Sequence, residues 1–385
     1  TNQYSATIHS PGLLEQLRNE KFDAAVSEPM DMCGFAIFHK IGITKQAAAL
    51  SLSNSEGTFD YSGLPSFPSY VPGSTTGFGE RMTFLERVRN TIDLGFGKIF
   101  VPIILNSQHD LFKSAFGDDF PDIVQMARSA SLFFINAEPL IEFPRPILHK
   151  LIDIGGVSVS TGHQPLNSTW SSLLDQRKYT VFISFGTVAK SHLMPDQYKQ
   201  SIRETAKNFP EATFIWKYER PEHNISEGID NLVDATWVPQ NDLLYDRRLS
   251  LFITHGGQGS TTESTTAGVP LIVIPVMGDQ VRNAAVINRV GTGIVLEKTS
   301  LSNSEALSDA IRIILSDEKY KTKARFLGEM IRNRPFSAKE TFVRNMEFLA
   351  KYGPLRQFDH YGLQLNFIQY YLIDVFAFLT AIAIL

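Results

Sequence analysis

The residues that decide the fold are Phe-Ile-Thr-His-Gly-Gly-Gln-Gly-Ser-Thr-Thr-Glu at 252–263, Gly-Val-Pro-Leu-Ile-Val-Ile-Pro at 268–275 and Gly-Asp-Gln at 278–280. A strand of mostly apolar residues runs here into a glycine turn and then into a helix. Gly256, Gly257 and Gly259 let the backbone approach a ligand closely. Backbone N–H groups and hydroxyls at the start of such a helix suit a diphosphate.

Polar side chains of this stretch can form hydrogen bonds to a nucleotide. His255 can donate to a phosphate oxygen, Ser260 lies at the helix N-terminus, and Glu263 can accept from ribose hydroxyls. Asp279 and Gln280 follow the next strand, so we expect them to read hydroxyls at the same sheet edge. Taken alone, a glycine turn after a strand would equally suit a dinucleotide, and a single histidine is more often structural.

The surrounding sequence predicts a parallel sheet. Strands are expected at 180–184, 213–216, 249–254 and 271–275, and helices at 195–209, 259–267, 281–289 and 304–315. Continuous apolar strands between amphipathic helices indicate a sheet that is covered on both faces. Ligands bind outside the carboxyl ends of the strands of such a sheet.

The first half of the sequence is less regular. We expect a helix followed by a strand within 10–27, a loop at 54–80, a helix at 84–96 and a strand at 131–136. Phe-Pro-Arg-Pro at 143–146 cannot lie inside a helix or a central strand, and we predict the interdomain linker there. The predicted divisions are an incomplete N-terminal domain at 1–145, a C-terminal domain at 146–335, helices at 336–366, and a terminal apolar segment at 367–385.

Composition excludes several classes of protein. The 385 residues suffice for two domains with cores of their own. A net charge of −4 gives no electrostatic basis for binding nucleic acid. Cys33 is the single cysteine, which excludes an internal disulfide and a zinc site built on several thiolates.

The sequence stops inside an apolar run, 370–385, that is shorter than the ~20 residues of a membrane helix. We expect a truncated transmembrane segment, with a buried helix as the alternative. The carboxylate of Asp374 is the main argument against a transmembrane segment.

Taken together, 252–280 closely resembles the signature of the UDP-glycosyltransferases, the UDP-glucuronosyltransferase family, including its invertebrate members. The resemblance implies an α/β fold of two Rossmann-like domains facing across a cleft, the GT-B type. It also implies a UDP-sugar donor, an acceptor bound by the N-terminal domain, and a C-terminal membrane helix.

Two further segments are similar to family motifs. Residues 237–244 look like the uracil-binding stretch, in which Trp237 stacks on the base, although Trp237 alone would equally suit a core. Residues 184–187 resemble a second phosphate-side loop. The expected UDP-sugar-binding residues are therefore Ser184, Gly186, Thr187, Trp237, Gln240, His255, Gly257, Gly259, Ser260, Glu263, Asp279 and Gln280.

On the acceptor side, residues 22–28 resemble the family segment ending in an Asp that orients the catalytic His. Glu28 stands at that position, and a carboxylate can hold an imidazole tautomer. The alternative is that Glu28 only caps a strand end. The base His is expected upstream of Thr1. No Asp-x-Asp occurs, so we expect neither a metal nor a cofactor besides the UDP-sugar.

Asn136 is the candidate for sugar selection. Family members that use glucuronate carry an Arg at the matching position, which suits a carboxylate through two N–H bonds. Asn brings no charge, so we expect UDP-glucose to be preferred over UDP-glucuronate. The alternative is that Asn136 only ends a strand and Arg145 or another base reaches the carboxylate.

The expected reaction is inverting transfer of glucose or glucuronate to a hydroxyl of a small lipophilic acceptor, as in detoxification by glucuronidation. The family implies an endoplasmic reticulum membrane enzyme with lumenal domains, which the sequons at Asn167 and Asn224 fit, and a homo- or hetero-oligomer. The alternative is a catalytically deficient nucleotide-sugar-binding partner of another member.

Overall fold

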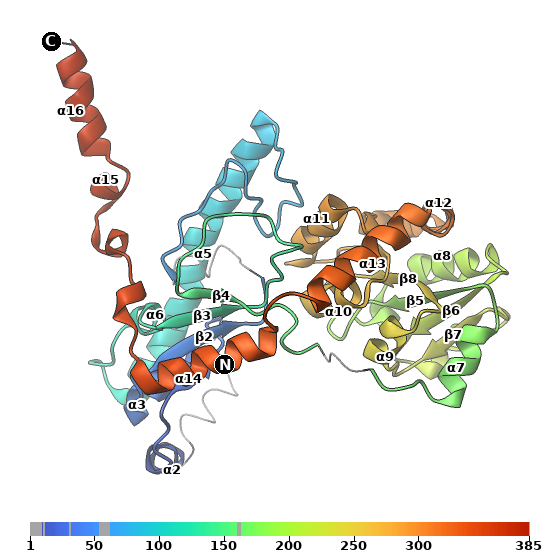
Figure 1. Cartoon of the computed structure of the whole chain (residues 1–385), viewed down its shortest axis with the longest axis horizontal. Coiled ribbons are helices and arrows are strands. Elements are labelled where there is room, and N and C mark those ends of the chain that lie inside the picture. The colour runs from blue at the N-terminus through green and yellow to red at the C-terminus, as the bar shows by residue number, and fades with distance from the viewer. Residues whose placement is uncertain (1–9, 11, 31, 54–61, 160–162, 385) are drawn as a thin grey trace.

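Two parallel sheets organise the chain. The structure, a computed structural model, describes residues 10, 12–30, 32–53, 62–159 and 163–384. Among these residues a four-stranded sheet has the order β1-β2-β3-β4 and a six-stranded sheet the order β10-β9-β8-β5-β6-β7. Every strand pair in both sheets is parallel. Figure 1 shows the two sheets side by side, with helices around each.

The N-terminal half contains the smaller sheet. Its strands are β1 (Ala25–Ser27), β2 (Gln46–Leu50), β3 (Leu132–Ile135) and β4 (Leu151–Asp153), and its helices are α2 (Leu13–Asn19), α3 (Cys33–Ile41), α5 (Phe84–Phe116) and α6 (Ile123–Arg128). The capping box of Thr83 and Glu86 starts α5 where the sequence predicts a helix. The helix continues 20 residues beyond the predicted end at 96, because Gly97 and Pro102 do not interrupt it.

The C-terminal half contains the larger sheet. Its strands are β5 (Tyr179–Ser184), β6 (Ala212–Lys217), β7 (Leu232–Ala235), β8 (Leu249–Thr254), β9 (Leu271–Val273) and β10 (Gly293–Val295). Its helices are α7 (Ser168–Asp175), α8 (Asp196–Lys207), α9 (Gln240–Tyr245), α10 (Gln258–Ala267), α11 (Gln280–Val290), α12 (Ser304–Ser316) and α13 (Glu318–Arg332). The four predicted strands and four predicted helices are confirmed. The two edge strands, β7 and β10, are short and only partly buried, so they lack the apolar pattern of a central strand.

The strand order creates a switch point between β5 and β8. Strands β6 and β7 follow β5 on one side, whereas β8, β9 and β10 extend on the other, which is the doubly wound order. Phe182 of β5 stacks on Phe252 of β8 with ring centroids 4.8 Å apart, and Ser184 pairs with Thr254 at the carboxyl end. The turns that follow β5 and β8 therefore leave the sheet as neighbours.

The linker predicted at 143–146 is wrong. Strand β4 follows this segment and pairs with β3, so the N-terminal sheet continues to Asp153. The prolines do exclude a central strand, but they mark the loop between β3 and β4. Phe143 in that loop is buried in a cluster with Val286 of α11 and Ile331 of α13, so the loop docks the first half onto the second.

The chain returns to its first half after α13. Helix α14 (Ala338–Tyr352) packs on the N-terminal sheet, where Phe342 meets Phe134 with ring centroids 4.7 Å apart. Figure 1 shows α14 beside this sheet and α13 beside α10. At the crossing, Arg334 donates to Glu138 Oε2 at 2.5 Å and to the Gly155 carbonyl at 3.0 Å. The two connections between the halves are thus tied together.

Beyond α14 the chain runs away from both sheets through α15 (Phe367–Tyr370) and α16 (Ile373–Ile384), as Figure 1 shows. The apolar side chains of α16 are exposed. In the part of the chain that the structure describes, no helix combines the length and the apolar character that a membrane crossing requires.

Candidate active site

Two turns close around the imidazole of His255. A Cβ at Gly186, after β5, would lie 2.6 Å from His255 Cε1, and a Cβ at Gly257 would lie 2.7 Å from Nε2. Gly186 also has φ +86°, which side chains other than glycine rarely adopt. Glycines at both positions are therefore required for the two turns to meet against the ring. Four predicted residues, Ser184, Gly186, His255 and Gly257, come together here.

His255 is a neutral imidazole. Its side chain is buried, and burial lowers the pKa to about 4, with the nearby Lys217 charge as a second cause. Lys217 ends β6 and donates from Nζ to the Gly186 carbonyl at 2.9 Å. Thr254 Oγ1 lies 3.4 Å from His255 Nδ1. When this hydroxyl donates to Nδ1, the ring proton stands on Nε2, which faces the two turns.

Helix α10 presents its N-terminus to the same place. Gly257 is its N-cap residue, and no side chain caps the first turn. The positive end of the helix dipole and the N–H groups of this turn favour an anion. The helix is buried although it is rich in Ser and Thr, because Ser264, Thr265 and Thr266 donate to carbonyls one turn earlier.

A polar cluster with an exposed indole lies at the start of α9. Gln240 Nε2 donates to Glu263 Oε2 at 2.5 Å and to Ser260 Oγ at 3.3 Å. Burial raises the pKa of Glu263, and the Gln240 hydrogen bond opposes that shift. Trp237 is 68% exposed, which excludes the alternative that it packs in the core. Its indole is open to a planar ligand three residues from Gln240.

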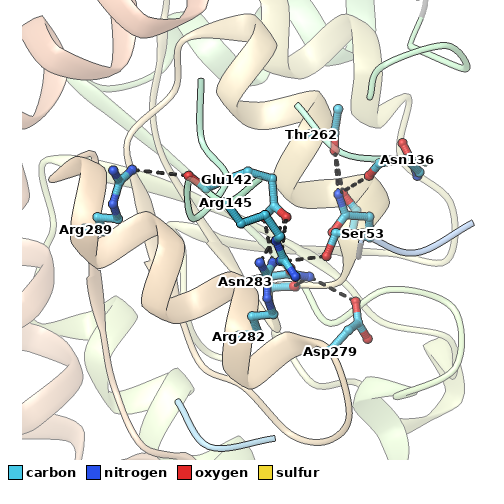
Figure 2. A network of polar contacts seen from close by, with 11 residues as sticks. Ser53, Asn136, Glu142, Arg145, Thr262, Asp279, Arg282, Asn283 and Arg289 are labelled. Atoms are coloured by element: carbon cyan, nitrogen blue, oxygen red, sulfur yellow. Dashed lines mark hydrogen bonds and ion pairs between the residues drawn. The ribbon is translucent and has the colours of Figure 1, made fainter. Parts of the chain in front are cut away.

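Asp279 is held by its own helix and by α10. Asn283 Nδ2 donates to Asp279 Oδ2 and to the Gly256 carbonyl, each at 2.9 Å, and Figure 2 shows Asn283 beside Asp279. Burial raises the pKa of Asp279, while hydrogen bonds from Asn283 and the Gln258 backbone N–H lower it. Asn283 therefore holds both the glycine turn after β8 and the carboxylate of Asp279, which is predicted to bind hydroxyls of the ligand.

The remaining residues that are predicted to bind the UDP-sugar lie at the same edge of the larger sheet. Gln280 Oε1 accepts from the backbone N–H groups of Val276 and Met277 at 2.8 and 3.0 Å, so this side chain shapes the turn after β9. Thr187 is exposed directly after Gly186, and Gly259 is exposed in the first turn of α10.

A chain of hydrogen bonds links the carboxyl edge of the smaller sheet to this edge of the larger sheet. The Ser51 N–H donates to Glu28 Oε2 at 2.7 Å, and Asn136 Nδ2 donates to the Ser51 carbonyl at 2.8 Å. Gln258 Nε2 of α10 then donates to the Asn136 carbonyl at 2.8 Å. Glu28, Ser51 and Asn136 follow β1, β2 and β3, so the carboxyl edges of the two sheets face each other.

Within the described residues, carboxylates and imidazoles do not gather into a metal centre. Among the residues that the structure describes, no three His, Cys, Asp or Glu side chains are placed to hold an ion. One oxygen of Glu28, Oε1, is buried and has no hydrogen-bond partner among those residues.

A family profile described as UDP-glucoronosyl and UDP-glucosyl transferase matches residues 2–385. The chain belongs to this family of UDP-glycosyltransferases. It is an enzyme of that class, as the resemblance of 252–280 predicts, and its relatives include the expected invertebrate members.

The relatives carry both glucuronosyl and glucosyl names. A putative UDP-glucuronosyltransferase of Caenorhabditis elegans, ugt-48, is 30% identical over 392 residues, which cover 100% of this chain and 74% of that protein. UDP-glucosyltransferase 2 of Dactylopius coccus is 28% identical over 388 residues, 98% of this chain and 72% of that protein.

Solved structures show the same fold. The UDP-glucose:anthocyanidin 3-O-glucosyltransferase crystallised with UDP matches with a TM-score of 0.62 at 15% identity, over 91% of this chain and 81% of that one. The architecture of two parallel sheets whose carboxyl edges face each other is therefore the GT-B glycosyltransferase fold.

Three residues of this UDP-glycosyltransferase site are not predicted from the sequence: Lys217, Gln258 and Asn283. Lys217 directly follows the strand predicted at 213–216, so the rule that ligands bind at carboxyl ends could have found it. Asn283 lies one helical turn after Asp279, a spacing at which side chains meet. Gln258 carries no such signal, because its partner Asn136 is 122 residues away.

We predict that His255 stays neutral down to about pH 5. Its imidazole signals in 1H–15N NMR should move only near the pKa of about 4, below the ordinary 6.5. Because the pKa is lower in the folded state, the stability from a neutral His255 is complete above pH 6.5. It is lost as the pH falls toward 4.

The control is Lys217→Met, which removes the second cause of the shift and should raise the pKa of His255. A wild-type midpoint at or above 6.5 would contradict the desolvated site.

Proposed function

We propose that this UDP-glycosyltransferase transfers glucose from UDP-glucose to a hydroxyl of a small lipophilic acceptor, with inversion at the anomeric carbon. The observation that carries the proposal is the neutral His255, enclosed by two glycine turns at the uncapped start of α10. This arrangement provides an N–H donor and a helix dipole where a diphosphate would gather charge.

The nucleotide lies along α9 and α10 in this proposal. The uracil stacks on the exposed face of Trp237, and Gln240 hydrogen-bonds the base or the ribose. Glu263 accepts from the ribose hydroxyls. Burial raises the pKa of this carboxyl, and the hydrogen bond from Gln240 opposes that shift and orients the carboxylate.

The diphosphate lies between the turns after β5 and β8. The backbone N–H group of Thr187 on one side and those of Gly259 and Ser260 on the other approach its oxygens, while the Gly186 N–H donates to Ser184 Oγ. Nε2–H of His255 donates to the leaving phosphate. Donors that are already in place stabilise developing charge without reorganisation, and the Lys217 cation adds to them. The proposal therefore includes no metal and no further cofactor.

Bond making and bond breaking occur in one displacement. The acceptor oxygen attacks the anomeric carbon from the face opposite to UDP, its proton passes to a histidine base, and the bond to the phosphate oxygen breaks. Attack from the opposite face inverts the configuration. Glu28 suits the orientation of that base: Oε2 is held by the Ser51 N–H, and the buried Oε1 can accept an imidazole N–H.

The surroundings of Asn136 favour a neutral sugar. Asp279 and Gln280 read the sugar hydroxyls, and Asn136 lies at the opposite edge of the cleft. Arg145, the alternative partner for a glucuronate carboxylate, is 5% exposed and faces Glu142 at 3.8 Å. Arg145 is thus held against Glu142, a carboxylate that Arg282 also binds, and this supports UDP-glucose as the preferred donor.

Location and association are further parts of the proposal. We place the enzyme at the endoplasmic reticulum membrane, with the exposed apolar α16 directed to the bilayer and the catalytic domains in the lumen, where it can associate with itself or with another member. The sequon at Asn167 lies at the start of α7 and that at Asn224 in a left-handed turn.

We predict that Trp237→Ala weakens binding of UDP itself. Loss of stacking should cost about 1–3 kcal/mol, the range measured for base–aromatic contacts. Calorimetric titration of the full-length enzyme with UDP measures this. Phe326→Ala, which removes another exposed ring from the same half, is the control and should bind UDP normally. Unchanged affinity in folded Trp237→Ala would refute the stacking role.

We predict that UDP-glucose is used in preference to UDP-glucuronate. Competition between the two donors with one acceptor gives the ratio of kcat/KM, and Asn136→Arg should move that ratio toward glucuronate, because a guanidinium pairs with its carboxylate. A wild-type preference for glucuronate would disprove the donor assignment. UDP binding without turnover of any donor would instead support the non-catalytic partner.

A further inference from the structure

A buried ion pair joins the two halves beside the sugar-reading residues. Arg282 of α11 meets Glu142, which lies in the loop between β3 and β4 of the other half. Nη1 donates to Oε1 at 2.6 Å and Nη2 to Oε2 at 3.0 Å, with side chains only 2% and 14% exposed. Figure 2 shows the guanidinium directed across to this carboxylate. Two parallel hydrogen bonds fix orientation as well as distance.

Further contacts fix the same guanidinium. Arg282 Nη1 donates to Ser53 Oγ, after β2, at 3.2 Å, and the guanidinium carbon lies 5.3 Å from the centre of the Phe143 ring. Arg289, two turns along α11, donates to the Glu142 carbonyl at 3.4 Å and lies over the same ring. Helix α11 of the C-terminal half therefore holds two loops of the N-terminal half, one after β2 and one after β3.

The pair lies within one helical turn of the proposed sugar site. Its neighbour Asn283 donates to Asp279 and to the Gly256 carbonyl of the glycine turn. On the opposite side, Ser53 lies two residues beyond Ser51, which bonds Glu28 and Asn136. A change in the position of α11 relative to these loops therefore displaces Asp279 relative to the acceptor edge.

Stability alone does not account for such a pair. Taking an arginine and a carboxylate out of water carries a desolvation penalty for each ion, and apolar replacement of a whole buried pair is often neutral or stabilising. What a bidentate pair gives, and an apolar contact does not, is a defined distance and direction between two bodies.

We propose that Arg282 is a positioning residue for glycosyl transfer, which sets the separation of the two halves through Glu142 and Ser53 and thereby aims Asp279 across the cleft. The inference rests on the proposed function of this site. Arg282 touches no substrate; it acts through α11.

The test is a double-mutant cycle in the full-length enzyme with Arg282→Met, Glu142→Met and both together. Glu142→Met leaves the buried Arg282 charge unpaired and should lower the melting temperature more than Arg282→Met, after which Glu142 keeps Arg145 at 3.8 Å; the double variant should regain part of the loss of Glu142→Met. Turnover should fall by about 100-fold in all three, because a displacement of 1 Å at a reacting centre costs that much. UDP affinity should not change, because the proposed contacts of UDP lie in the donor half.

Two variants on the same scale complete the test. Arg282→Lys keeps the charge but cannot form the two parallel hydrogen bonds to Glu142. Its turnover should therefore lie between those of wild type and Arg282→Met. Arg312→Met removes an exposed partner of Asp309 on α12 and should leave turnover and melting temperature unchanged.

The outcomes separate the two proposals. A double variant with wild-type kcat would overturn the positioning role, since the pair would then matter only for stability. Single variants with full turnover would overturn it as well. A wild-type enzyme that does not bind UDP would overturn the proposed function, and the role of Arg282 with it.

Discussion

Strands β5 and β8 pair with Ser184 opposite Thr254, so both strands end at the same level of the sheet. The turns that follow them therefore meet around the imidazole of His255. Glycines on both turns allow the backbone to close against the ring and exclude water from it. Exclusion of water lowers the pKa of His255 to about 4, so the ring offers a neutral N–H donor across the physiological range. A different register between these strands would separate the turns and return the ring to solvent.

The N-terminal half reaches this site through a few directed polar contacts. Gln258 meets the Asn136 carbonyl, and Arg282 meets Glu142, so each half supplies part of a geometry that neither has alone. The apolar contact of Phe143 with α11 and α13 adds attraction, but it fixes no direction. Small displacements between the halves are therefore expected to affect transfer more than they affect folding.

The sequence predicts the donor half well because its signals are local. A strand, a glycine turn and a helix start lie within twelve residues, and the strand ends locate the ligand edge. The sequence could not show whether Trp237 stacks on a base or packs in the core, because an indole suits both. The exposure of the side chain in the structure excludes the core. Pairing of β4 with β3 moves the domain boundary past the prolines. Arg282 and Glu142 are 140 residues apart, and no local pattern announces their contact.

The central claim is that the turns around His255 hold the diphosphate, and calorimetry with UDP and with uridine tests it most directly. The account predicts that UDP binds much more tightly than uridine. It also predicts that His255→Ala removes a large part of this difference while uridine binding stays the same, because the base contacts lie along α9 and α10. Equal affinities for UDP and uridine, or an unchanged difference in a folded His255→Ala variant, would contradict it.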